Sequence, residues 1–191
     1  MNNRPKVTVA ALQNKKMSSR KITLLTAYDF PMASFLDQAG IDIVLVSDAV
    51  GTIGNGKPEA VSVTVDEMTY HTRAVRNGVK SSMVVTTLPF GSYNCVNEAV
   101  GNATRIMKEG GADAVHLEGT AQSAEIVRSI VNSGIPVLGH IGFTKQHMVL
   151  SGTISLPAKD AESSKRMIND AMAMAQSGAF GLIVECLPKS L

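Results

Sequence analysis

The sequence lacks the features of several protein classes. It has two cysteines, Cys95 and Cys186, and neither lies in a Cys/His spacing typical of a metal site. A disulfide framework is therefore excluded, and both thiols are expected to be reduced, as in a cytoplasmic protein. No apolar run approaches the roughly 18 residues that span a membrane, and the N-terminal segment lacks the apolar core of a signal peptide. We therefore expect a cytoplasmic protein.

An excess of either charge is also absent. Lys and Arg together number 18 and Asp and Glu 16, which gives a formal net charge of +2. Proteins that hold nucleic acid or anionic membranes by electrostatics carry a clear positive excess. Neither partner is expected here, and the expected ligands are small molecules.

Two nucleotide-binding fingerprints are missing as well. The stretch GTIGNG, residues 51–56, has the wrong glycine spacing for a dinucleotide site, and no GxxxxGK(S/T) sequence occurs. The sequence therefore lacks the two motifs that would best indicate a nucleotide-binding doubly wound fold.

The chain does contain a repeated unit, which consists of an amphipathic stretch, a glycine and a short apolar run ending in a polar residue. A sixth apolar run, ITLLTAYD, precedes the five that follow glycines. These glycines are Gly40, Gly78, Gly111, Gly134 and Gly178. Each is placed where a helix ends in a left-handed residue, and each run is apolar on both faces, as in a buried parallel strand. The sequence predicts alternating strands and helices in one domain over residues 1–191.

Five amphipathic segments are expected to be helices. They are residues 30–39, 65–77, 96–110, 123–133 and 161–177. Thr64 and either Ser92 or Asn94 are expected to cap helix N-termini. Two long loops, residues 51–63 and 141–160, follow strand ends, where α/β folds place ligand sites, and are candidate lids.

Six parallel strands fit either an open doubly wound sheet or most of a (βα)8 barrel. A complete barrel typically needs about 250 residues. The length of 191 residues argues against a complete barrel.

The strand ends gather polar residues. They are Asp29, Asp48, Thr87, Glu118, His140 and Glu185. In a barrel these positions converge on one mouth, and carboxylates gathered there are costly unless they share a cation, for which oxygen ligands indicate Mg²⁺. The pattern indicates a metal that polarises a keto acid, with one free carboxylate removing a proton beside the carbonyl.

Structural interpretations stand beside this one. An acid at a strand end often caps the next helix, and His140 can equally be a hydrogen-bonded core residue. His71 is interpreted as helix surface or packing, His147 as a loop residue, and the ten methionines as core residues. Cys186, one residue past Glu185, is expected to point away from the mouth and is assigned no catalytic role.

Six segments resemble the ketopantoate hydroxymethyltransferase family and occur in the family's order. They are TLLTAYDFPMASFLDQAGIDIVLVSDAVG, VTVDEMTYHTRAVRNG, TLPFGSYN, GGADAVHLEG, GIPVLGHIGFTKQ and GAFGLIVECLP. The resemblance implies an α/β fold, a (βα)8 TIM barrel of the phosphoenolpyruvate/pyruvate superfamily, with six of eight βα units present. It also implies Mg²⁺-dependent transfer of a one-carbon unit from 5,10-methylenetetrahydrofolate to the metal-bound enolate of 3-methyl-2-oxobutanoate, in pantothenate biosynthesis. A homo-oligomer, usually a decamer, is implied as well.

The resemblance assigns roles to four residues that match the family's motifs. Asp48 corresponds to a metal ligand and Glu118 to a second acid of the metal shell. Glu185 corresponds to the general base that removes the C3 proton, and His140 to the histidine of the GHIG motif.

Three substrate-pocket positions depart from the family. The family reads GDS where this chain has Ser47-Asp48-Ala49, so the methyl group of Ala49 replaces a hydroxyl that contacts the substrate. Thr87 replaces an aspartate metal ligand, so Mg²⁺ is expected to be held more weakly there or through water. His116 replaces the lysine that meets the keto acid's carboxylate, and unlike lysine it is not charged at neutral pH without help.

The chain also departs from the family in its lid and its length. It reads SGTISLPAK where the family has GGY and a basic segment, and it ends at Leu191 where the family continues with two further βα units. The expectation is a barrel domain incomplete at the C-terminus. Such a barrel is either a fragment or completed by another chain, and it exposes the edges of its first and last strands.

Three functions remain open at this point. The first is a hydroxymethyltransferase. The second is a catalytically impaired paralogue or pseudoenzyme, which the three changed pocket positions favour and the four retained residues oppose. The third is a related enolate-forming enzyme acting on a different 2-oxo acid, which the exchange of lysine for His116 favours.

Overall fold

We describe the protein from a computed structural model, of which residues 4–144, 157–189 and 191 are considered. Six parallel strands form one curved sheet, and their order across the sheet is their order along the chain. The strands are β1 Leu24–Thr26, β2 Ile43–Val46, β3 Met83–Thr87, β4 Ala114–Glu118, β5 Val137–Gly142 and β6 Gly181–Glu185. A doubly wound sheet would reverse its strand order. The uninterrupted order is that of a barrel, and it confirms six of the units of a (βα)8 fold.

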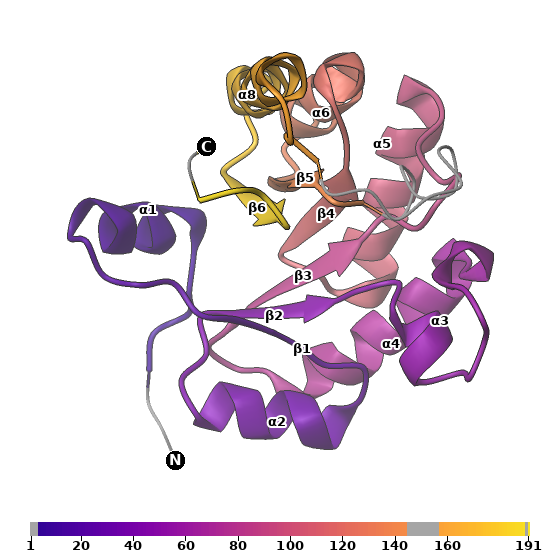
Figure 1. Ribbon diagram of the computed structural model, residues 1–191. Coiled ribbons are helices and arrows are strands. Elements are labelled where there is room, and N and C mark those ends of the chain that lie inside the picture. The colour runs from indigo at the N-terminus through magenta and orange to yellow at the C-terminus, as the bar shows by residue number, and fades with distance from the viewer. Residues whose placement is uncertain (1–3, 145–156, 190) are drawn as a thin grey trace.

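Most of the helices cover the outside of this sheet, whereas the first one lies at the N-terminal ends of the strands (Figure 1). The helices are α1 Val9–Met17, α2 Phe30–Gln38, α3 Val50–Ile53, α4 Val65–Gly78, α5 Val96–Arg105, α6 Ala124–Asn132 and α8 Ala161–Gln176. A π-helical turn, Ile106–Gly110, extends α5, and the single turns Ala60–Ser62 and Ala121–Ser123 are 3-10 helices. All five predicted helices are confirmed, whereas α1 and α3 were not predicted. Within the described residues, no helix combines the length and the apolar character that crossing a membrane requires.

The predicted helix caps were partly right. Thr64 begins α4 in a capping box, because its Oγ1 accepts from the N–H of Glu67 while the Glu67 carboxylate accepts from the N–H of Thr64. The prediction for α5 was wrong. Its N-cap is Cys95, whose side chain makes no capping bond, rather than Ser92 or Asn94.

Four of the five predicted left-handed glycines are confirmed. They are Gly40, Gly111, Gly134 and Gly178, with φ between 79° and 95°. Gly78 is the exception, because it is the last residue of α4 and its φ is not positive. A Cβ there would lie 2.6 Å from the carbonyl oxygen of Phe30, so close packing of α4 against α2 explains this glycine.

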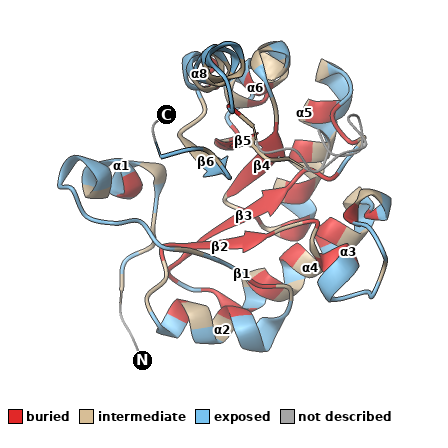
Figure 2. Ribbon diagram, viewed as in Figure 1, coloured by how far each residue is buried: buried red, intermediate tan, exposed pale blue. Residues whose placement is uncertain are grey.

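Burial of the strands is uneven (Figure 2). β2, β3 and β4 are buried throughout, and β5 nearly so, as predicted for strands covered on both faces. The same prediction was wrong for β1 and β6, which are largely exposed or half-buried. These two strands lie at the edges of the described sheet and have a strand neighbour on one side only.

The inner face of the sheet divides into two layers. Its lower layer, toward the N-terminal ends of the strands, is apolar and packs against Leu12 of α1. It consists of Ile43, Leu45, Met83, Val85, Ala114 and Leu138. The polar residues lie above this layer, at the C-terminal strand ends.

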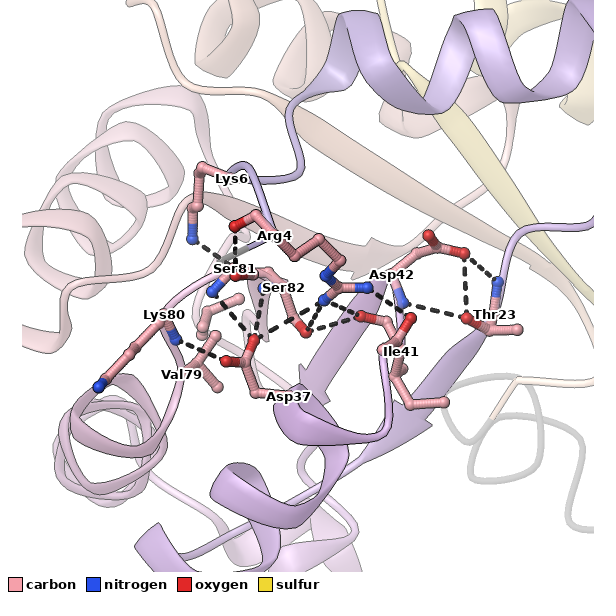
Figure 3. A network of polar contacts seen from close by, with 12 residues as sticks. Arg4, Lys6, Thr23, Asp37, Ile41, Asp42, Val79, Lys80, Ser81 and Ser82 are labelled. Carbon is pink, nitrogen blue, oxygen red and sulfur yellow. Dashed lines mark hydrogen bonds and ion pairs between the residues drawn. The ribbon is translucent and has the colours of Figure 1, made fainter. Parts of the chain in front are cut away.

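A polar network closes the opposite, N-terminal end of the strands (Figure 3). The carboxylate of Asp37, in the last turn of α2, accepts from the backbone N–H groups of Lys80, Ser81 and Ser82 at 3.1, 3.0 and 2.7 Å. Arg4 donates to Oγ of Ser82 at 2.9 Å. The network therefore ties the N-terminal segment and α2 to the start of β3.

Candidate active site

A cavity of about 620 Å³ opens above the apolar layer, at the C-terminal ends of the strands. Its polar wall comes from five strand-end side chains and one serine. These are Ser47, Asp48, His116, Glu118, His140 and Glu185. The loop 51–63 adds further wall residues, so the first of the two candidate lids borders the cavity. Residues 145–156 of the second candidate lid, His147 among them, lie outside the described residues.

Asp48 and Glu118 form the acidic part of the wall. Asp48 follows β2 by two residues and Glu118 ends β4, and they are only 9% and 8% exposed. Both also border a second cavity of about 10 Å³, together with Thr87. Asp48, Glu118 and Thr87 thus line the same small cavity.

Glu185 and His140 form a contact across β5 and β6. Nε2 of His140 lies 3.0 Å from Oε2 of Glu185, and the two side chains are 10% and 48% exposed. Gly142 makes this approach possible, because a Cβ on it would lie 2.2 Å from the carbonyl oxygen of Glu185. Its φ of 105° is also one that residues other than glycine rarely adopt. The second glycine of the GHIG motif therefore lets the ends of the two strands meet.

His116 and Thr87 are partners in the β3–β4 register. Oγ1 of Thr87 lies 2.9 Å from Nδ1 of His116, and both residues are buried. The ring of His116 lies 5.3 Å, between centroids, from the ring of His140. Two of the departures from the family thus contact each other directly.

Some polar residues singled out in the sequence lie outside the cavity. Asp29 caps α2, because its Oδ1 accepts from the N–H of Met32 at 2.8 Å, so the capping interpretation holds for this residue. Ala49 begins α3 and lines neither cavity. His71 is a packing residue, with Nδ1 2.8 Å from the carbonyl oxygen of Tyr28.

The two cysteines are free and exposed. Cys186 follows β6 with a left-handed φ of 56°, so strand alternation does not determine where its side chain points. Neither cysteine lines the cavities described above.

Ser47 is the wall residue that sequence reasoning missed. Its hydroxyl lies 3.1 Å from the hydroxyl of Tyr28, which comes from the segment between β1 and α2. The available signal was the comparison of GDS with Ser47-Asp48-Ala49, in which a hydroxyl is both lost and gained.

Comparison with known proteins links this chain to a family and a fold. The family model described as ketopantoate hydroxymethyltransferase matches residues 6–191. A 3-methyl-2-oxobutanoate hydroxymethyltransferase from Clostridium botulinum (strain Alaska E43 / Type E3) is 43% identical over 187 residues, covering 97% of this chain and 68% of the relative. One from Clostridium novyi (strain NT) is 44% identical with the same coverage.

Solved structures share the fold at low sequence identity. Phosphonopyruvate hydrolase in complex with oxalate and Mg²⁺ gives a TM-score of 0.70 at 15% identity, covering 95% of this chain and 64% of that one. 2,3-Dimethylmalate lyase, a member of the PEP mutase/isocitrate lyase superfamily, gives 0.67 at 16% identity, covering 94% and 62%. The chain therefore spans about two thirds of the length of the proteins it matches.

Proposed function

The chain belongs to the ketopantoate hydroxymethyltransferase family, and we propose that it transfers a one-carbon unit from 5,10-methylenetetrahydrofolate to 3-methyl-2-oxobutanoate, in pantothenate biosynthesis. One observation carries the proposal. The four residues that match the family's site, Asp48, Glu118, His140 and Glu185, line a single cavity although they come from four different strand ends.

Asp48 and Glu118 are the residues that would hold Mg²⁺. Both residues are nearly buried and line the same small cavity. Within the described ranges, no group of three or more His, Cys, Asp or Glu side chains is arranged to hold a metal. Two carboxylates nevertheless fit Mg²⁺, which commonly takes one or two from the protein and completes its shell with water and substrate oxygens. When bound, the ion would polarise the carbonyl group of a 2-oxo acid.

The phosphonopyruvate hydrolase of the same fold was solved with Mg²⁺ and oxalate. Oxalate is a small dicarboxylate that offers two neighbouring oxygens to one cation, as a 2-oxo acid does. This likeness supports the choice of ligand class for the cavity of the present chain.

Glu185 would accept the proton from C3 of the keto acid. Its Oε2 lies 3.0 Å from Nε2 of His140, and both residues line the cavity. The carboxylate is then the group that receives the proton. With that proton removed, C3 carries the electron pair that forms the new bond to the one-carbon unit.

His116 would contact the carboxylate of the keto acid, in the position of the family's lysine. Its ring lines the cavity, and the hydrogen bond between Nδ1 and Thr87 fixes the plane of the ring. Thr87 borders the smaller cavity beside Asp48 and Glu118, where it offers a neutral oxygen instead of a third carboxylate.

The Thr87–His116 pair also favours a second candidate function. It replaces the two charged residues of the family with a neutral hydroxyl and an imidazole that contact each other. A related enzyme that forms an enolate from a different 2-oxo acid would account for this change. Loss of activity in an impaired paralogue would account for it as well, so the experiment must separate all three.

The test is deuterium exchange at C3 of 3-methyl-2-oxobutanoate in D₂O, followed by NMR with and without Mg²⁺. Exchange needs the metal and the base but no folate. Mg²⁺-dependent exchange is the expected result. Exchange on another 2-oxo acid only would favour the second candidate, and a folded protein that exchanges none would favour the impaired paralogue.

We also propose that residues 1–191 act as one barrel domain within a cytoplasmic homo-oligomer, a decamer by family resemblance. Large apolar side chains support association, because Phe35 of α2 and Met172 of α8 are exposed. Sedimentation velocity tests this, and a monomer at all concentrations would contradict it.

A further inference from the structure

Ser47 places a hydroxyl in the cavity wall next to Asp48. The family that this chain resembles has glycine at position 47 and the substrate-contacting serine at position 49. In this chain the serine is at position 47 and an alanine is at position 49, and Ala49 lines neither cavity. The hydroxyl has therefore moved from one side of Asp48 to the other.

Two groups hold the hydroxyl of Ser47 in place. The backbone N–H of Ala49 donates to its Oγ at 3.3 Å, and the hydroxyl of Tyr28 lies 3.1 Å from the same atom. Tyr28 is itself fixed, because its carbonyl oxygen contacts Nδ1 of His71 on α4 at 2.8 Å. Ser47 is thus anchored from two directions, and neither of its partners lines the cavity.

The direction of the hydrogen bond between Tyr28 and Ser47 decides which way the hydroxyl hydrogen of Ser47 points. A serine hydroxyl accepts at two lone pairs and donates one hydrogen. Either hydroxyl can donate in the contact between Tyr28 and Ser47. With Tyr28 as the donor, its O–H occupies one lone pair of Ser47 and the N–H of Ala49 occupies the other. The hydrogen of Ser47 is then left to donate into the cavity that the residue lines.

We propose that Ser47 is a substrate-binding residue, which donates a hydrogen bond to an oxygen of the bound 2-oxo acid, and that Tyr28 is the positioning residue that orients it. The assignment rests on the proposed function for the identity of the ligand. Oxygen is the acceptor because a 2-oxo acid presents a carboxylate and a carbonyl, and the carbonyl oxygen gains negative charge as C3 loses its proton. A preoriented donor at that point stabilises the developing charge.

The experiment measures binding rather than turnover. 3-Methyl-2-oxobutanoate and oxalate are each titrated by calorimetry, in the presence of Mg²⁺, into the full chain and its variants. The variants are Ser47→Ala, Ser47→Gly, Ser47→Thr and Tyr28→Phe. Ser34→Ala is the matched control, because Ser34 is also a half-buried serine that accepts a hydrogen bond, from Gln38, but lies on α2 outside the cavity.

We expect Ser47→Ala and Ser47→Gly to weaken binding about tenfold or more, since the lost bond involves a charged acceptor. Ser47→Thr keeps the hydroxyl and should bind as the parent does, as should Ser34→Ala. Tyr28→Phe should weaken binding in the parent but not in the Ser47→Ala background. A purely structural role of Tyr28 would act equally in both backgrounds and would overturn its assignment.

The outcomes separate this inference from the proposed function. Unchanged binding of both ligands by Ser47→Ala and Ser47→Gly would overturn the role of Ser47 and leave the proposed function standing. Weakened binding of oxalate by these variants, with no binding of 3-methyl-2-oxobutanoate by the parent, would support Ser47 and overturn the substrate. A folded parent that binds neither ligand would overturn both.

Discussion

Nε2 of His140 lies 3.0 Å from Oε2 of Glu185, across the last two strands of the described sheet. Glu185 ends an exposed edge strand, so without this contact its carboxylate would be free to turn into solvent. His140 is nearly buried and lies above the apolar layer. The contact therefore places the proposed base beside His140 at the cavity wall.

Replacing Glu185 tests the base directly. We expect Glu185→Gln to lower C3 deuterium exchange by about two orders of magnitude or more, since the amide cannot accept the proton. Mg²⁺ binding, measured by calorimetry, should remain near the parent value because Asp48 and Glu118 are intact. Glu125→Gln on α6 is the control and should exchange normally. Equal exchange rates in Glu185→Gln and the parent would contradict the assignment.

Restoring the family's residues tests the Thr87–His116 pair. Thr87→Asp adds a third carboxylate beside Asp48 and Glu118, so we expect it to tighten Mg²⁺ binding about tenfold or more. The double variant Thr87→Asp/His116→Lys should in addition exchange 3-methyl-2-oxobutanoate faster than the parent. No gain in the double variant would indicate a changed substrate instead of decay from the family reaction.

Replacing Gly142 tests whether this glycine allows the close approach of β5 and β6. Gly142→Ala should destabilise the protein by about 1–3 kcal/mol, because its φ is positive and its Cβ would collide with the backbone of Glu185. It should also lower C3 exchange, since the base is displaced. Gly101→Ala in α5 is the opposite case. Apart from the nearby backbone of its own helix, no atom lies within 4 Å of its added Cβ, so urea denaturation should show a gain of about 0.5–1 kcal/mol.

Asp37 should make stability depend on pH. Burial alone would raise the pKa of its carboxyl group, but hydrogen bonds from the backbone of Ser82, Lys80 and Ser81 outweigh burial and hold the pKa below its ordinary value. The folded-state pKa is therefore lower than the unfolded one. The stabilisation is complete above the unfolded pKa of about 3.9 and disappears as pH falls through the folded-state value.

The variant Asp37→Asn measures this contribution. At neutral pH we expect it to lower the free energy of unfolding by about 1–3 kcal/mol, because the backbone donors lose a charged acceptor. The difference from the parent should shrink as the pH of the urea titration is lowered into the acid range. A difference that stays constant to acid pH would show that the charge of Asp37 is not the cause.

The strands and the main helices could be predicted from the sequence because their signals are local. Apolar runs gave all six strands, five of them after a glycine, and amphipathic spacing gave five helices. Gly78 was misinterpreted because its reason is tertiary, a contact with the carbonyl oxygen of Phe30. α1 was missed because its only buried residue is Leu12.

The site could be predicted in outline for a geometric reason. The strand-end residues of a parallel barrel converge at one end, independently of the conformation of the loops. Asp48, Glu118, His140 and Glu185 were therefore expected to lie together. Asp29 has the same sequence signal but caps a helix. The contacts of Ser47 with Tyr28 and of Thr87 with His116 join residues 19 and 29 positions apart, and no sequence period encodes such pairs.

The inner face of the sheet has an apolar layer that stabilises the fold and a separate polar layer that carries the proposed site residues. The apolar layer around Met83 and Leu138 packs against α1 without help from the polar residues above it. Ala49, Thr87 and His116 are not part of that layer. The pocket can therefore accumulate changes in sequence while the barrel beneath it persists, which makes this half of the molecule open to evolutionary drift or to a new substrate.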